Sequence, residues 1–304
     1  MPTEPHLDLP RRVLTRRALL ADGWSDSRIA RAVREDRLQR VLPGTYLDGT
    51  GAVTVQERVR CATVHLGPDA VAVLHTAALL HGLPAPWPSD DRTHVALPRG
   101  QEQNQRLGFC FHNWVLEPTE VQLVDGIRVT TPLRTLIDVM CMTDVLSAVA
   151  ALDSALRMGL VTESDRDRMP HVVRQRRGAA RSRNWWPLGD ARAESPLESR
   201  VRVRAVLGGY PPDDLQHTVV AGGRRYRADL AWFRKDGRTL LMEADGDAFH
   251  SSSLAVAKDR ERGNAIVATG SADLIRVIWS DSVRPQTVPE LLSRHLGPPR
   301  TKPT

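Results

Sequence analysis

The sequence has few cysteines, and those present lie far apart. The 304 residues contain three, Cys61, Cys110 and Cys141, and no two of them form a Cys-x-x-Cys pair. A disulfide framework or a zinc cluster is therefore not expected. Free thiols in a reducing compartment fit this pattern better.

Long apolar runs are also missing. No window approaches about eighteen uncharged apolar residues, so no membrane span is expected. The N-terminus lacks the apolar stretch of a secretory signal. Together these absences predict a cytoplasmic protein.

Lysine is scarce, although the chain is basic. Of the 42 Lys and Arg residues only three are lysines, and the net charge is +6. Arginine is well suited to bidentate phosphate contacts. The charge balance permits nucleic-acid binding without establishing it.

The length is enough for two or three domains, and the pattern of elements predicts a mixed α/β (α+β) multidomain protein. Four segments can be separated. They are a winged helix-turn-helix DNA-binding domain at 1–50, a middle α/β domain at 53–165, an Arg-rich linker helix at 166–192, and a mixed sheet flanked by helices at 193–297.

The first segment predicts two helices and a small hairpin. Thr15 can cap a helix over 16–22, and Ser25 can cap a second helix whose inner face carries Ile29 and Ala32. Polar side chains would lie outward, and the second helix would enter a major groove while the hairpin contacts the backbone. The predicted DNA-binding residues are Ser27, Arg28, Arg31, Arg34 and Arg40. The alternative is a small packing module with a solvated arginine face.

The middle segment shows no catalytic pattern. Its helices are expected at 55–66, 70–80, 132–140 and 145–158, and its strands at 93–97, 108–114 and 126–131. His75 and His81 fit buried core histidines better than ligands, and His94 and His112 have no carboxylates at a useful spacing. We expect a structural or partner-binding module.

The linker carries seven arginines and one acidic residue between residues 166 and 183, followed by Trp185 and Trp186. It could be a basic helix that meets phosphates, with tryptophans stacked on bases. It could instead be a solvated helix held by tryptophans in the core, which we favour for the tryptophans. The first alternative leaves RNA binding or RNA cleavage as a further hypothesis.

The last segment predicts the order helix, three strands, helix, strand, helix. The expected ranges are 195–207, 215–220, 226–233, 239–245, 254–268, 274–279 and 288–295. Ser195 and Glu198 fit a capping box at the start of the first helix. Glu198 could equally help to hold a metal-bound water.

Acidic residues gather on the predicted hairpin. Glu243 and Asp245 point to the same face because side chains alternate along a strand. A two-residue turn would place Asp229 on the other face, whereas a three-residue loop over 235–237 would place it opposite Glu243, with Gly237 in the left-handed conformation. The carboxylates could then hold Mg²⁺ or Mn²⁺, which supplies the nucleophile and charge neutralisation in phosphodiester cleavage.

Other side chains near these acids suit the same chemistry. His250 could act as general base or as acid for the leaving group. Lys258, Arg260 and Arg262 could hold the scissile phosphate. Their ordinary alternatives are a surface histidine and a helix salt bridge.

The last segment resembles the domain related to very-short-patch mismatch-repair endonucleases, within the PD-(D/E)XK superfamily. The motifs that carry the resemblance are Glu194–Glu198, Arg227–Trp232, Glu243–Gly246, Phe249–Ser251, Asp259–Arg262 and Leu274–Val277. The resemblance implies a restriction-endonuclease-like fold and Mg²⁺-dependent DNA cleavage. It implies Asp229 and Glu243 as metal ligands, with Glu198, Asp245 and His250 completing the catalytic set. Asp245 stands where the superfamily usually has its catalytic lysine, which puts activity in question.

The N-terminal half resembles the AbiEi-type antitoxins of type IV toxin–antitoxin systems. The matching stretches are Arg40–Tyr46, Thr76–Leu83 and Val129–Asp138. This resemblance implies DNA binding, autorepression and a cognate toxin as partner. Two main functions follow: a metal-dependent DNA endonuclease targeted by the winged helix, or a non-catalytic DNA-binding regulator or antitoxin that keeps a nuclease fold as scaffold.

Overall fold

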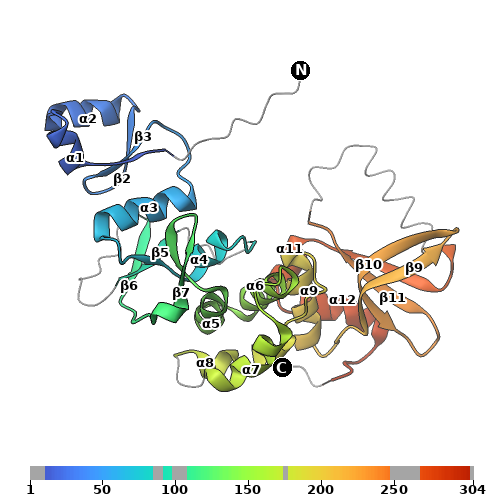
Figure 1. The fold of residues 1–304 in the computed structure, drawn as a ribbon. Coiled ribbons are helices and arrows are strands. Elements are labelled where there is room, and N and C mark those ends of the chain that lie inside the picture. Colours follow the sequence, from blue (N-terminus) through green and yellow to red (C-terminus); the bar gives the residue numbers. More distant parts are fainter. Residues whose placement is uncertain (1–10, 85–91, 98–107, 174–176, 247–267, 302–304) are drawn as a thin grey trace. The chain divides into compact units, whose positions relative to one another are not determined.

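The computed structural model describes residues 11–84, 92–97, 108–173, 177–246 and 268–301 (Figure 1). The chain divides into two compact units, and each is considered by itself. Unit 1 comprises Met1–Leu83 and Ser89–Val139, and unit 2 comprises Pro84–Pro88 and Met140–Thr304. The described parts form a mixed α+β protein with three sheets. No helix among them is long and apolar enough to span a bilayer.

Unit 1 begins with two short helices and a three-stranded sheet. The elements are β1 (Val13–Thr15), α1 (Arg16–Ala21), α2 (Asp26–Arg34), β2 (Leu38–Leu42) and β3 (Thr45–Asp48), and the sheet order is β1-β3-β2. The Thr15 and Ser25 side chains cap the two helices, as the sequence predicts. Ile29 and Ala32 are buried, so the inner face of α2 is also as expected.

The rest of unit 1 is a five-stranded sheet with helices. Its strands are β4 (Val71–Ala72), β5 (Thr93–Ala96), β6 (Phe109–His112), β7 (Val121–Val124) and β8 (Ile127–Thr130), in the order β6-β5-β4-β8-β7. Helix α3 (Val55–Leu66) contacts β5, and α4 (Leu74–Leu80) lies beside β5 and β8. Helix α5 (Pro132–Met142) runs on from unit 1 into unit 2.

The helix expected over 70–80 is wrong in its first turn. Val71 and Ala72 form β4, which pairs with β5 and with β8, and the helix begins only at Leu74. A short apolar run fits a buried strand and a buried helix equally well, and only the partner strands decide between them. The sequence did not predict strand β7, because Val121–Val124 is a short run without strict apolar–polar alternation.

Unit 2 begins with a helical layer. Helix α6 (Val145–Arg157) packs against α9 (Pro196–Leu207), and between them in sequence lie α7 (Glu163–Val172), α8 (Ala179–Ser182) and a 3-10 helix (Arg183–Leu188). The described part of the segment predicted as one linker helix thus contains three short helices. Trp186 is fully buried, which favours the packing interpretation of the tryptophans.

The remainder of unit 2 is a mixed four-stranded sheet. Its strands are β9 (Asp214–Ala221), β10 (Arg224–Phe233), β11 (Thr239–Ala244) and β12 (Ala272–Val277), in the order β12-β11-β10-β9. Strand β10 is antiparallel to both neighbours, and β12 is parallel to β11. Side chains of α9 and of α12 (Thr287–Leu296) share one buried core with Trp232, Leu240 and Met242, beside α11 (Trp279–Val283). The helix expected over 254–268 lies almost entirely outside the described residues.

The β10–β11 hairpin has the register that a three-residue loop requires. Leu230 pairs with Met242 and Phe233 with Thr239, and the Arg234 N–H donates to the Arg238 carbonyl at 2.9 Å. The loop is therefore 235–237, and Gly237 has the left-handed φ of +80°. Continued by one residue, this register places Asp229 opposite Glu243.

Candidate nucleic-acid interface and acidic site

The predicted DNA-binding side chains lie on the exposed face of α2 and on β2. Ser27, Arg28, Arg31 and Arg34 of α2 are exposed, as is Arg40 of β2. They are exposed because Ile29 and Ala32 turn the opposite face of α2 into the core. The arrangement presents several cations to solvent from one helix and the neighbouring hairpin.

Weak contacts hold two of these cations, Arg28 and Arg31. The Arg28 guanidinium lies over the Trp24 ring, 4.1 Å from its centroid, and Arg31 Nε is 3.3 Å from the Glu35 carboxylate. Exposed ion pairs of this kind contribute roughly 0.2–1 kcal/mol. Exchanging them for phosphate contacts therefore costs little.

The acidic site lies where β10 and β11 face each other. The Asp229 carboxylate accepts a hydrogen bond of 2.8 Å from the Ala244 N–H, and Glu243 is buried with only 8 % exposure. Arg276 of β12 approaches Glu243, with 3.4 Å between Nε and the carboxylate. Mg²⁺ is commonly held by one or two carboxylates together with water and phosphate oxygens, so this pair of acids suits it chemically.

Glu198 combines a capping role with a place near these acids. The Ser195 hydroxyl accepts from the Glu198 N–H, but the Glu198 carboxylate accepts from the Glu194 N–H, one residue before the cap. The expected capping box is therefore shifted by one residue. Burial raises the pKa of Glu198, and the negative charge of Asp229 raises this pKa further.

Sequence reasoning missed Gln216, which also reaches Glu198. Its amide donates to the Glu198 carboxylate at 2.8 Å, and its φ of +55° is unusual for a residue other than glycine. The register of β9 and β10 is the same on either side of Gln216, since Ala228 pairs with His217 and Leu230 with Leu215, so Gln216 lies across from Asp229. A residue other than glycine with a positive φ often marks a functional site, but nothing in the local sequence predicts it here.

The other predicted catalytic residues are less well placed or lie outside the described part. Asp245 follows β11 and is exposed, and its N–H donates to the Val277 carbonyl at 2.8 Å. His250, Lys258, Arg260 and Arg262 fall outside the described residues. Their predicted roles stay predictions.

The structure also joins three residues of the middle segment that sequence reasoning kept apart. His94, Cys110 and His112 place one nitrogen or sulfur ligand atom each within 4.8 Å of one another. The available signal was Cys-x-His at 110–112, whose two side chains share a strand face. Because this pair belongs to no Cys-x-x-Cys motif and has no carboxylate at a useful spacing, the sequence did not predict a site there.

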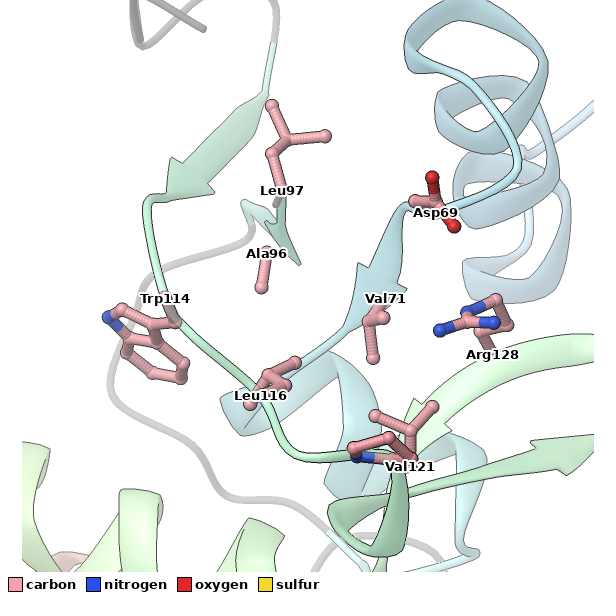
Figure 2. Close-up of a pocket in the computed structure, with 9 residues that line it drawn as sticks. Asp69, Val71, Ala96, Leu97, Trp114, Leu116, Val121 and Arg128 are labelled. Atoms are coloured by element: carbon pink, nitrogen blue, oxygen red, sulfur yellow. The ribbon is translucent and has the colours of Figure 1, made fainter. Parts of the chain in front are cut away.

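Unit 1 also contains a cavity of about 460 Å³ (Figure 2). Its wall is mostly apolar, and its two charged lining residues, Asp69 and Arg128, lie together on the side away from Trp114. The remaining lining residues are Val71, Ala96, Leu97, Leu116, Pro118 and Val121. An apolar wall with a few polar groups on one side is typical of ligand pockets.

Comparison with known proteins gives relatives along most of the chain. Two proteins of Mycobacterium tuberculosis, named as uncharacterized proteins MT2308 and Rv2248, are each 30% identical over 269 residues, which is 87% of this chain and 94% of each relative. The chain belongs to their family. Within this chain, residues 70–186 match the family described as "AbiEi antitoxin C-terminal domain".

The matched region covers much of the middle segment and ends at Trp186, within the 3-10 helix. It supports the antitoxin resemblance and extends it through the Arg-rich segment. A crystal structure of the RV2827C protein from Mycobacterium tuberculosis is also similar, with 14% identity, a TM-score of 0.43, and coverage of 69% of this chain and 84% of that one.

Proposed function

We propose that this protein is a DNA-binding regulator of the antitoxin type. The observation that carries the proposal is the antitoxin-domain match over residues 70–186, preceded by a two-helix unit with an exposed arginine face. Regulators of this kind need one element for DNA and another for a protein partner. In this proposal the two-helix unit is the first element and the region 70–186 is the second.

The N-terminal block acts as a winged helix-turn-helix in this proposal. Helix α2 enters a major groove, where the side chains Ser27, Arg28 and Arg31 reach base edges and phosphates. Arg40, on the β2–β3 hairpin, contacts the adjacent backbone. The region matching the antitoxin domain would bind a cognate toxin.

The test is binding of the full-length protein to DNA from its own promoter, followed by fluorescence anisotropy. Arg28→Ala with Arg31→Ala should weaken binding at least tenfold, because each arginine contributes about 1 kcal/mol or more. The plot of log K against log salt should also become less steep, with the magnitude of its slope smaller by about 2.

Arg284→Ala with Arg294→Ala is the matched control, since both arginines are exposed in unit 2 and the change in net charge is equal. This control should bind like the wild type. Equal weakening in the two double variants would show a general charge effect and remove the assignment of α2. Absence of binding by the wild type would refute the proposal.

A second candidate function is Mg²⁺-dependent DNA cleavage by the acidic site. Two observations favour it. The strand register brings Asp229 opposite Glu243, and the charge of Asp229 raises the pKa of Glu198. A bound Mg²⁺ would supply an activated water and neutralise charge on the phosphate. Asp229 and Glu243 would hold the ion, and Arg276 would provide a cation beside Glu243 in place of the lysine that Asp245 replaces.

Plasmid nicking in the presence of Mg²⁺ or Mn²⁺ tests this candidate. Asp229→Asn should abolish nicking, and Asp236→Asn, at the exposed loop of the same hairpin, should retain it. If wild type and Asp229→Asn nick equally, the activity is a contaminant. If the wild type does not nick at all, the regulator proposal stands and the nuclease proposal falls.

A further inference from the structure

Two strands of unit 1 bring His94, Cys110 and His112 together on one side of the sheet. Strands β5 and β6 are parallel neighbours, with His94 paired to Cys110 and Ala96 paired to His112. Residues paired across strands, or two apart on one strand, share a face. Val95 and Phe109, on the other face, belong to the core that includes Cys61 and Ala62 of α3, so the three side chains point away from α3.

The ligand atoms already have nearly the separation that a metal ion requires. His94 Nδ1 lies 2.9 Å from His112 Nε2, and each ligand atom of the group lies within 4.8 Å of the others. Two nitrogens bound to one tetrahedral Zn²⁺ at about 2.0–2.1 Å are about 3.3 Å apart. A small rotation of the two histidine side chains would separate their nitrogens by the few tenths of an ångström that the ion requires.

The surroundings hold the ligands in place. The backbone N–H of His94 donates to the Thr76 hydroxyl at 2.7 Å. The rings of His94 and His112 are stacked, with their centroids 5.2 Å apart. Trp114 packs on His112 with centroids 4.6 Å apart and also lines the cavity (Figure 2). His94 is 5 % exposed and Cys110 8 %, whereas His112 is half-buried and gives an ion a route from solvent.

We propose that His94, Cys110 and His112 form a Zn²⁺ site. Two imidazoles and one thiolate suit Zn²⁺ and disfavour Mg²⁺, which prefers oxygen ligands. Binding takes both histidines as neutral rings and the cysteine as thiolate, so one proton leaves the thiol when the ion enters. Three protein ligands leave a fourth tetrahedral position for water or another group.

The ion would fasten β6 to the sheet. Among the described strands, β6 lies at the edge of its sheet and has β5 as its neighbour. A zinc ion shared by one ligand from β5 and two from β6 would tie the two strands beside the cavity. This role is independent of the proposed DNA binding and of the acidic site.

The experiment uses the full-length, tag-free protein, freed of metal and kept reduced with a reductant that does not chelate. Co²⁺ replaces Zn²⁺ as a visible probe, because a thiolate bound to Co²⁺ gives a charge-transfer band that carboxylates do not give. The wild type should bind one Co²⁺ per chain with this band, and Zn²⁺ should remove it by displacement.

Cys110→Ser should lose the band, and His112→Gln should weaken Co²⁺ binding at least tenfold. Cys141→Ser is the matched control and should keep the band, since Cys141 is as buried as Cys110 at 7 % exposure but lies in unit 2. Zn²⁺ should also raise the Tm of the wild type and leave that of His112→Gln unchanged.

The proposal is overturned if the wild type shows no thiolate band with Co²⁺, or if Cys110→Ser retains it. Because His112 is half-buried, His112→Gln should fold even if Cys110→Ser does not, and far-UV circular dichroism checks both. Unchanged Co²⁺ affinity in folded His112→Gln would equally overturn it.

Discussion

At the scale of single residues, the acidic site depends on how Glu198 responds to its neighbours. Burial is the largest cause that raises the Glu198 pKa above its ordinary value of 4.5, and Asp229 adds to it. Between the unfolded and folded pKa values the folded state binds more protons, so this group makes stability fall as pH rises through that window.

Asp229→Asn should therefore lower the pKa of Glu198, because one of the charges that disfavour ionisation is gone. An NMR titration of the Glu198 carboxyl measures this shift. Asp236→Asn, in the exposed hairpin loop, should leave the Glu198 pKa unchanged. A Glu198 pKa that is the same in wild type and Asp229→Asn would place the two acids too far apart to share a site.

Two glycines with similar backbone angles should respond very differently to alanine. Gly178 has φ +88° and a Cβ there would lie 2.1 Å from the Cys141 carbonyl oxygen, whereas Gly237 has φ +80° and open space around it. We expect Gly237→Ala to lower the free energy of unfolding by about 1 kcal/mol, because alanine is strained in the left-handed backbone conformation. Gly178→Ala should cost at least about 2 kcal/mol more, because backbone must move. Urea unfolding of both variants compares them, and equal costs would contradict the close approach.

At the scale of elements, a buried ion pair joins the two long helices of unit 2. Arg202 of α9 donates to Asp153 of α6 at 2.7 Å, and Asp153 also accepts from the Asp190 N–H. Burial raises the pKa of Asp153 in spite of the nearby arginine. The pair therefore contributes mainly by satisfying a carboxylate that the packing of the helices has removed from water.

Arg202→Leu should destabilise the protein by about 3–5 kcal/mol, because it leaves the buried carboxylate without its cation. Arg227→Leu removes the exposed ion pair with Glu194 and should cost at most about 1 kcal/mol. Denaturant unfolding measures both. Adding Asp153→Leu to Arg202→Leu should restore part of the loss, and no recovery would point to lost packing rather than to the unpaired charge.

At the scale of the whole molecule, the two units have separate cores, so they should unfold in separate steps. The core around Trp232 and Leu240 lies within unit 2, and the core around Leu47 and Phe109 lies within unit 1. Calorimetry of the full chain should show two transitions. Arg202→Leu should lower one of them selectively, and a single transition that shifts as a whole would contradict the division.

Acid should weaken unit 1 through Glu57. Two hydrogen bonds from Arg11 are the main cause that lowers the pKa of Glu57 from 4.5 to about 2. The unfolded state binds more protons between these values, so the contribution is complete above pH 4.5 and is lost as pH falls towards 2. At about 1.4 kcal/mol per pKa unit it amounts to about 3 kcal/mol. Calorimetry at several pH values should show that Glu57→Gln loses less stability in acid than the wild type does. The same dependence of stability on pH in both proteins would contradict this.

Local patterns were enough to predict much of this protein. The caps Thr15, Ser25 and Ser195 start their helices as expected, because a capping hydroxyl acts within one turn of its own backbone. The hairpin of β10 and β11 follows in the same way from alternation and a glycine. The sequence also suggested that Asp229 and Glu243 could face each other, but it allowed two loop lengths, and only the observed strand pairing decided between them.

The contacts that join distant segments came only from the tertiary structure. Val71 and Ala72 are a strand because β5 and β8 lie on either side of them, which no short apolar run reveals. Gln216 of β9 reaches Glu198 of α9 only because folding brings this strand and this helix together. His94 meets Cys110 and His112 because two parallel strands bring them into register. The sequence by itself determined which helices and hairpin can form, since those depend on neighbouring residues. Folding decided which side chains share a site, since that depends on the alignment of strands far apart in the chain.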